Sequence, residues 1–298
     1  MPQKIAVAII HGIGNDNPGF QDPNQPEKFT GGIAKRLKSQ FSQLRGRNAD
    51  GEAPELEIDA IYWAHILQKP QNDLWKRLEI EKLGWGDIRN FVFNSLADSV
   101  GYQITSATPP DDRAVYDGVH QCFADTLHRL AEKAGPNAPL CVIAHSMGAA
   151  IASNYIWDIQ SGGVKAGSNK IEIHDNPLEK LETLTLLYTL GNQIPLWALR
   201  YNDFGTPVAV PSPNLSAHYP ELEGEWVNYY DKDDVLGYPI KHMNNKYKEA
   251  VKEDREVNVG GLLSWTPLSH NGYWTNDRVT RPISQALFRL WQSVNLGT

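Results

Sequence analysis

The stretch PLCVIAHSMGAA, residues 139–150, decides how the rest of the sequence is interpreted. Its apolar run, residues 140–144, predicts a short strand buried on both faces, and a helix is predicted to begin directly after Ser146. A sharp turn from strand to helix pushes the hydroxyl of its central residue out at the top of the sheet, and it requires small residues two positions before and after. Ala144 and Gly148 meet that requirement. The alternative is a serine that only caps the following helix.

Strands and helices alternate along the chain on both sides of this turn. Apolar runs predict strands, and apolar residues three and four positions apart predict helices. The alternation predicts an α/β fold, a three-layer α/β/α sandwich with a mostly parallel sheet and helices on both faces. The strands are expected at residues 5–10, 56–63, 140–144, 184–190 and 226–230, and the main helices at 29–44, 115–130, 147–157 and 279–294.

The length of 298 residues fits a single domain, because α/β folds of this size are often built around one sheet. Residues 65–108 are too long for an ordinary crossover connection and carry apolar residues at helical spacing. We interpret them as a helical insertion at one edge of the sheet, forming a cap or lid, with a long pair of packing helices as the alternative. Residues 202–224 are rich in proline and predict a long loop.

The composition excludes several classes of protein. Hydrophobic residues make up 41% of the chain, which excludes global disorder, and 28 basic against 35 acidic residues give a net charge of −7, which argues against nucleic acid as a partner. Cys122 and Cys141 are too few for a disulfide framework and fit a reducing compartment. The N-terminal segment lacks the features of a signal peptide, and no run approaches the ~18 apolar residues of a spanning helix. The sequence therefore predicts a soluble cytoplasmic protein without membrane insertion.

A nucleophilic serine needs a histidine base and a carboxylate that orients the histidine. In folds with this type of turn, the acid comes after the serine in the sequence, and the histidine comes after the acid. His270 lies in a polar loop before the last helix, and His242 is the only other histidine after the acidic loop. That loop follows the strand at residues 226–230 and contains Asp231, Asp233 and Asp234. We select Asp233 as the acid and Asp234 as its main alternative.

Donors for an oxyanion are expected from two turns. The sequence His11-Gly12-Ile13-Gly14 directly follows the first strand, where small residues leave backbone N–H groups free to point into a site. We expect the N–H groups of Ile13, or alternatively Gly12, and of Met147 to form an oxyanion hole. A plain glycine-rich turn is the alternative for the first of these loops.

Cofactor sites are not indicated. A dinucleotide loop would need a helix at its third glycine and an acidic residue at the end of the next strand, and neither is found. We found no pair of histidine, cysteine or acidic residues at liganding spacing on a predicted helix, so no metal is expected.

Three motifs together resemble those of the α/β-hydrolases, in particular bacterial lipase-like and esterase-like serine hydrolases. They are the small-x-Ser-x-Gly turn around Ser146, the His-Gly-x-Gly loop at residues 11–14, and the Ser-His and Tyr-Trp pairs of residues 269–274. The sequence departs from the usual pattern of this family at two places. Ala144 stands where the family usually has glycine, and the oxyanion loop follows the first strand, whereas it normally follows the third. The second departure implies that the leading antiparallel strands are missing, which leaves a reduced sheet of six strands.

The resemblance implies an enzyme that cleaves carboxylic esters through an acyl-enzyme intermediate with Ser146, Asp233 and His270. Thioester or amide hydrolysis by the same residues is an alternative, as is a non-catalytic binding protein with the same fold. Apolar and aromatic residues in segments 65–108 and 193–222 favour a small-molecule ester with an apolar acyl group. The alternative for these residues is that they only close the core. The oligomeric state is left open.

Overall fold

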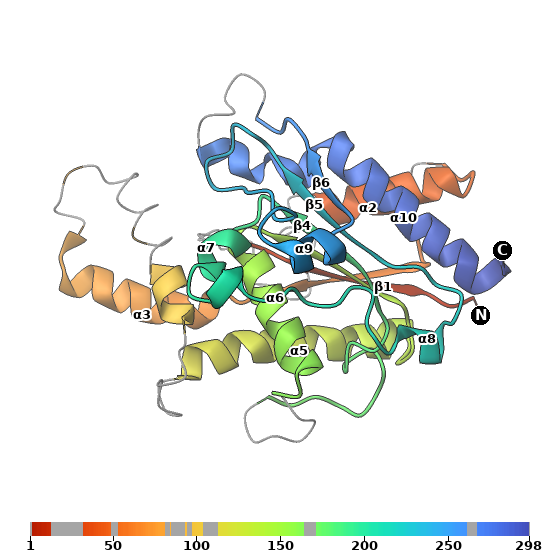
Figure 1. Ribbon diagram of the computed structural model, residues 1–298, viewed down its shortest axis with the longest axis horizontal. Coiled ribbons are helices and arrows are strands. Elements are labelled where there is room, and N and C mark those ends of the chain that lie inside the picture. Colours follow the sequence, from red (N-terminus) through yellow and green to blue (C-terminus); the bar gives the residue numbers. More distant parts are fainter. Residues whose placement is uncertain are drawn as a thin grey trace.

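A parallel sheet of six strands runs through the molecule in the order β2-β1-β3-β4-β5-β6 (Figure 1). Every neighbouring pair of strands is parallel. The strands are β1 (Ile5–Ile10), β2 (Leu56–Ile61), β3 (Leu140–His145), β4 (Leu184–Leu190), β5 (Glu225–Tyr230) and β6 (Glu253–Glu256). The structure is a computed structural model that describes residues 2–12, 32–48, 53–80, 84, 93, 97–103, 113–163, 171–260 and 267–297.

Helices cover both faces of this sheet (Figure 1). On one face α2 (Ile33–Leu44) packs beside α10 (Asp277–Leu296), and on the other lie α5 (Ala114–Ala134) and α6 (Met147–Gln160). The fold is therefore α/β with three layers, as predicted. The shorter helices are α3 (Ala64–Arg77), α7 (Ile194–Ala198), α8 (Leu215–His218) and α9 (Asn245–Ala250), and 3₁₀ turns form η4 (Asn202–Phe204) and η6 (Pro267–Thr275).

The core consists of two hydrophobic clusters, one on each face of the sheet. Alternate side chains of a strand point to opposite faces, and β1 is buried along its whole length. Ala8 and Ile10 pack with side chains of α5 and α6, whereas Val7 and Ile9 pack with those of α2 and α10. This double burial explains why β1 reads as a continuous apolar run.

The predicted strands agree with the structure to within two residues at each end, and those at 5–10 and 184–190 agree fully. The edge strand β6 was not identified. It reads EDRE, four charged residues that are mostly half-exposed, and it pairs only with β5. A charged edge strand has no apolar alternation to reveal it and resists pairing with other chains.

The predicted cap at residues 65–108 lies partly outside the described residues. Of that segment the structure describes α3, which lies beside α5, and the short stretch 97–103. The predicted loop at residues 202–224 contains η4 and α8 and is otherwise irregular. Among the described helices, none combines the length and the apolar character needed to cross a membrane.

Candidate active site

The predicted site residues gather where the carboxyl ends of the strands meet. Gly12 follows β1, Ser146 follows β3 and Asp234 lies in the loop after β5. His270 lies in η6, after β6. Open parallel sheets bind ligands at this edge, because the loops that follow the strands converge there.

Ser146 has the strained backbone that a sharp turn from strand to helix demands. Its φ is 56° and its ψ is −129°, a conformation that residues other than glycine rarely adopt. The residue precedes the first turn of α6, but its side chain makes no capping hydrogen bond. Ser146 therefore occupies the N-cap position of α6 without the side-chain hydrogen bond that a capping serine makes. The backbone N–H of Ser146 donates to the carbonyl of Leu190, 2.9 Å away, which ties the turn to the end of β4.

Two glycines allow the backbones around Ser146 to approach closely. A Cβ atom on Gly148 would lie 2.3 Å from the carbonyl oxygen of His11, and one on Gly12 would lie 2.4 Å from the Cβ of Ser146. Neither position can hold a larger residue without displacing the backbone. The prediction that residue 148 must be small is confirmed.

His270 and Asp234 form a buried pair. The distance from His270 Nδ1 to Asp234 Oδ2 is 2.7 Å, and the two side chains are 8% and 2% exposed. A carboxylate only accepts hydrogen bonds, so Nδ1 carries a proton, and in the neutral ring Nε2 then carries the lone pair. Nε2 is buried and makes no hydrogen bond within the described part of the chain. This is the tautomer that a general base requires.

Two further donors hold the Asp234 carboxylate. The N–H of Leu236 donates to Oδ1 over 3.0 Å, and the hydroxyl of Tyr273 donates to Oδ2 over 2.9 Å. Burial alone would raise the pKa of this carboxyl, but the hydrogen bond and charge of His270, with these other donors, hold it below its usual range. Asp234 is consequently ionised at neutral pH.

The three acids of this loop have different positions, and the selection of Asp233 is corrected to Asp234. Asp231 is buried, and its carboxylate accepts from the N–H groups of Asp233, at 3.0 Å, and of Val259, at 2.7 Å. This local turn leaves the side chain of Asp233 exposed and directs the next residue inward. The side chain against His270 is therefore that of Asp234.

His145 directly precedes Ser146 and His11 directly precedes Gly12, and both histidines bind backbone carbonyl groups. His145 Nε2 donates to the carbonyl of His270 over 2.8 Å, and His11 Nδ1 donates to that of Gly12 over 2.6 Å. Burial lowers the pKa of His11 to about 3 and holds that of His145 well below its usual value. Both rings are therefore neutral at physiological pH, and His145 ties the loop of His270 to the turn of Ser146.

Glycines also make room for the histidine–aspartate pair, which sequence reasoning missed. Gly191 has a φ of 50°, and a Cβ there would lie 3.0 Å from His270 Cε1 and 3.1 Å from Asp234 Oδ2. A Cβ on Gly237 would lie 2.6 Å from the same Oδ2. The one available signal was Gly191, a glycine directly after a buried strand.

One of the predicted oxyanion donors can be located. Met147 is the first residue of α6, so its N–H has no acceptor within the helix and lies at the positive end of the helix dipole. Ile13 lies outside the described residues. The alternative, Gly12, is described, and its α-carbon lies against the Ser146 side chain.

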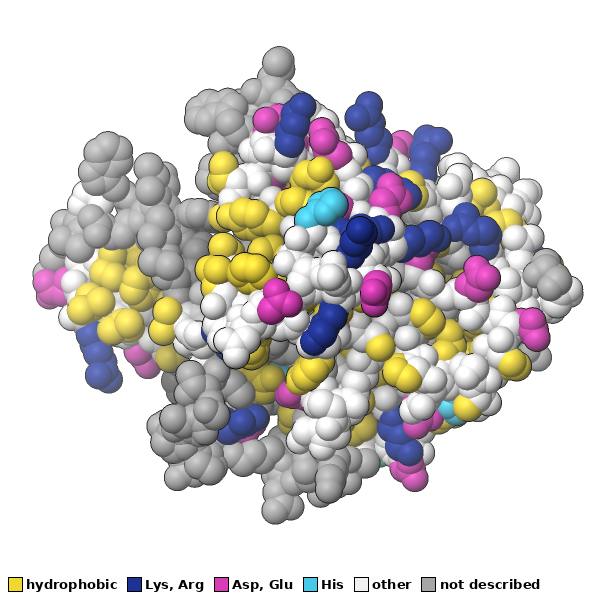
Figure 2. All heavy atoms as spheres, in the orientation of Figure 1, with side chains coloured by type: hydrophobic (Ala, Val, Ile, Leu, Met, Phe, Trp, Pro, Cys, Tyr) yellow, Lys and Arg dark blue, Asp and Glu magenta, His cyan; other side chains and the backbone are white. Residues whose placement is uncertain are grey.

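A cavity of about 310 Å³ opens beside α6. It lies between α6, α7 and η4, and its wall begins at Ala150, one turn along α6 from Ser146; neither Ser146 nor His270 lines it. Figure 2 shows hydrophobic side chains gathered on the face that carries α7. The exposed large hydrophobic residues in α7 and the three residues after it are Leu196, Leu199 and Tyr201. The cavity is lined by Ala150, Ser153, Asn154, Trp157, Ile194, Trp197, Ala198, Tyr201, Asn202, Phe204, Gly205, Thr206 and Tyr247.

A scan against protein-family models finds no match to this sequence, and a search of curated proteins finds no relative. The functional interpretation rests on the geometry of the site and on the motifs of the sequence.

Proposed function

We propose that the protein is a serine hydrolase of the α/β-hydrolase type that cleaves carboxylic esters. The observation that carries the proposal is the buried hydrogen bond from His270 to Asp234, on a loop that His145 fastens to the strained turn of Ser146. A structural histidine would be expected to satisfy both ring nitrogens when buried, whereas Nε2 of His270 has no partner among the described residues.

The reaction follows from the roles of these groups. Ser146 Oγ attacks the ester carbonyl carbon while His270 Nε2 takes its proton, and the N–H of Met147, with that of Gly12 or Ile13, stabilises the oxyanion. The tetrahedral intermediate collapses, and the alcohol leaves with the proton from His270. Water then attacks the acyl-enzyme by the same route and releases the carboxylic acid. Asp234 holds the imidazole in the required tautomer.

The proposal requires that His270 Nε2 reach the hydroxyl of Ser146 in the substrate complex, since the two are not hydrogen-bonded in the structure. Catalytic hydrogen bonds are often long in the free enzyme and shorten when substrate binds.

Covalent labelling tests the proposal directly. A fluorophosphonate probe is expected to add one phosphonyl group to the native protein, and peptide mass spectrometry should locate it on Ser146, because the probe reacts with a serine that a neighbouring base activates. Heat-denatured protein is the control and should stay unlabelled. A native protein without label would instead support a binding protein of the same fold.

The cavity beside α7 favours an ester with an apolar acyl group. Its walls include the aromatic rings of Trp197 and Phe204, and the exposed Leu196 directly precedes Trp197 in the sequence. An acyl chain that extends from Ser146 along α6 would reach this cavity first at Ala150. Burial of each methylene there would contribute about 0.8 kcal/mol.

A series of p-nitrophenyl esters measures this effect. From acetate to octanoate we expect kcat/KM to rise by up to about fourfold per methylene, as burial of the chain predicts. Phe204→Ala should flatten the rise because it removes a wall of the cavity. Leu199→Ala is the matched control, since Leu199 is exposed in the same segment but does not line the cavity. A sharp drop beyond acetate would exclude the cavity as the acyl site.

A further inference from the structure

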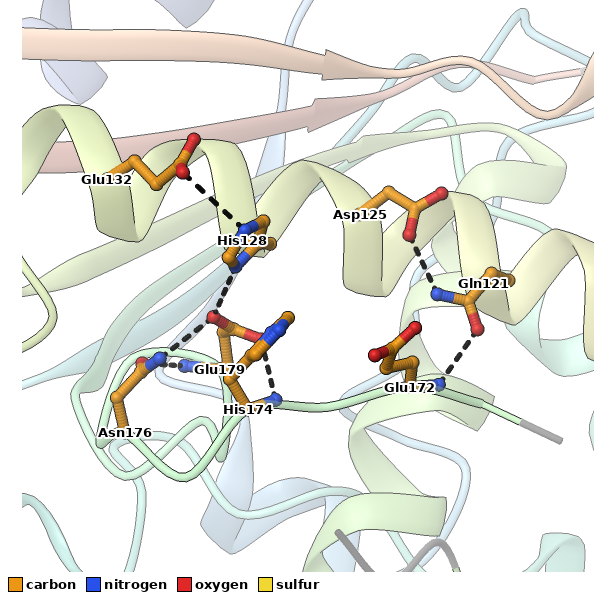
Figure 3. Close-up of polar contacts among 8 residues, drawn as sticks. All are labelled: Gln121, Asp125, His128, Glu132, Glu172, His174, Asn176 and Glu179. Atoms are coloured by element: carbon orange, nitrogen blue, oxygen red, sulfur yellow. Dashed lines mark hydrogen bonds and ion pairs between the residues drawn. The ribbon is translucent and has the colours of Figure 1, made fainter. Parts of the chain in front are cut away.

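A second group of polar side chains lies at the opposite end of the sheet, near the amino ends of β3 and β4. His128 belongs to the last turns of α5, and His174 and Glu179 belong to the segment that leads into β4 (Figure 3). The N–H of Leu178 donates to the carbonyl of Pro136, 2.9 Å away, which fixes this segment next to the start of β3. The cluster is thus remote from Ser146, which follows the carboxyl end of β3.

We propose that His128, His174 and Glu179 bind a divalent transition-metal ion, for which zinc is the best fit. Two imidazoles and one carboxylate are a donor set that zinc prefers, and three protein ligands leave a fourth tetrahedral position for water. The ligand atoms of the three residues all lie within 4.8 Å of one another. The proposal is independent of the hydrolase function.

Both imidazoles already point a nitrogen at the same carboxylate. The Nδ1 atoms of His128 and His174 lie 3.0 Å from Glu179 Oε1 and 3.0 Å from Oε2, respectively. The two rings are stacked with their centres 4.1 Å apart. An ion bound between these atoms would take the place of the protons on the two Nδ1 atoms. Each neutral ring would then carry its one proton on Nε2.

The carboxylate is held in place by groups that an ion would not displace. The N–H of His174 donates to Glu179 Oε2 over 2.9 Å, and the side-chain amide of Asn176 donates to Oε1 over 2.8 Å. The oxygen of that amide accepts from the N–H of Glu179 over 3.0 Å. These contacts preorganise the ligand, because they fix its orientation before an ion arrives.

A carboxylate also stands behind one of the imidazoles. Glu132 Oε1 lies 3.6 Å from Nε2 of His128, on the side opposite Glu179 (Figure 3). Histidines that bind a metal through one nitrogen usually donate the other N–H to such a carboxylate. His128 and Glu132 lie four residues apart on α5. Glu132 is not one of the three proposed ligands, of which α5 supplies only His128.

The charges around the cluster favour a cation. The Glu179 side chain is 1% exposed, whereas those of His128 and His174 are 40% and 48% exposed, so the cluster is open to solvent at its imidazoles. The carboxylate of Glu179 lies against both imidazoles and that of Glu132 lies beside His128, and their negative charges favour a divalent cation.

The location predicts a stabilising role. An ion bound here would add a further link between α5 and the segment before β4, which already meet through the hydrogen bond from the N–H of Glu172 to Gln121 Oε1. Because the ion binds the folded state, it should raise the melting temperature as its concentration exceeds the dissociation constant.

The test is titration of the chelator-stripped full chain with ZnCl₂ in competition with a chromophoric chelator. We expect one zinc ion per chain, and His128→Ala and His174→Ala should each weaken binding by more than about 100-fold, since even outer carboxylates contribute ten- to a hundredfold. Glu132→Gln should weaken it by about tenfold. His218→Ala is the matched control, because His218 pairs with a single carboxylate, that of Glu182 at 2.8 Å.

A second readout needs no variant. Cobalt(II) bound to the wild-type chain should give the intense visible absorption of a four-coordinate ion with nitrogen ligands, and zinc should displace it. Zinc affinity that is unchanged in His174→Ala, or a cobalt spectrum like that of the free hydrated ion, would overturn the proposal. Equal weakening in His218→Ala would also overturn it, since binding would then be non-specific.

Discussion

Replacement of Ser146 by alanine should lower kcat for p-nitrophenyl butyrate by about 10⁶-fold, as expected for loss of a triad nucleophile. Without the hydroxyl no acyl-enzyme can form, and only the oxyanion donors and substrate binding remain to accelerate attack by water. The measurement is the initial rate of nitrophenolate release at saturating ester. The variant should also lose its labelling by fluorophosphonate.

The fold of the Ser146→Ala variant should be unchanged, because the side chain makes no capping hydrogen bond to α6. Circular dichroism and the melting temperature check this. Ser161→Ala is the matched control, since Ser161 is an exposed serine at the other end of the same helix. Retention of more than about a tenth of the wild-type rate by Ser146→Ala would exclude Ser146 as the nucleophile, because all triad chemistry depends on its hydroxyl.

The interior strands could be predicted because strands that are buried on both faces consist mainly of apolar residues. β1 and β4 are buried along their whole lengths, so each reads as an unbroken apolar or threonine-containing run. β6 could not be predicted this way. Its four residues are charged, and they form a strand only because β5 offers a free edge with which to pair.

The order of the site residues along the chain could be predicted, but the identity of the acid could not. The turn of Ser146 and the late position of His270 follow from motifs along the chain. The choice between Asp233 and Asp234 depends on a local turn, in which Asp231 binds the N–H of Asp233. Such a contact turns one side chain outward and the next inward, and no periodic pattern in the sequence predicts that arrangement.

The candidate zinc site shows another limit of the sequence. Its histidines belong to α5 and to the segment before β4, and they meet only because β3 and α6 fold between them. Only the pair of His128 and Glu132, four residues apart, is visible in the sequence.

Replacement of Asp234 by asparagine should lower kcat by about 10⁴-fold, whereas Asp233→Asn should stay within about twofold of the wild type. Asp234 Oδ2 accepts hydrogen bonds from both His270 Nδ1 and the Tyr273 hydroxyl. If the NH₂ group of the asparagine occupied the position of Oδ2, it would face two hydrogen-bond donors. If the amide oxygen occupied that position, the NH₂ group would face the N–H of Leu236. The first arrangement reverses the imidazole tautomer and leaves Nε2 with the proton, so the ring can no longer act as a base.

Paired kinetics of the two variants separate the acids, because the residues are adjacent and the substitution is the same. Asp233 is exposed, so its amide removes only a solvated surface charge, whose effect salt should screen. Asp234→Asn also leaves a buried donor without a partner, which should cost about 1–3 kcal/mol of folding free energy, so melting curves must confirm that it is folded at the assay temperature. A folded Asp234→Asn variant with near wild-type kcat would contradict the pairing, and a large loss in Asp233→Asn alone would return the role to Asp233. Because a wrong tautomer impairs proton transfer, we expect the loss in kcat, with KM nearly unchanged.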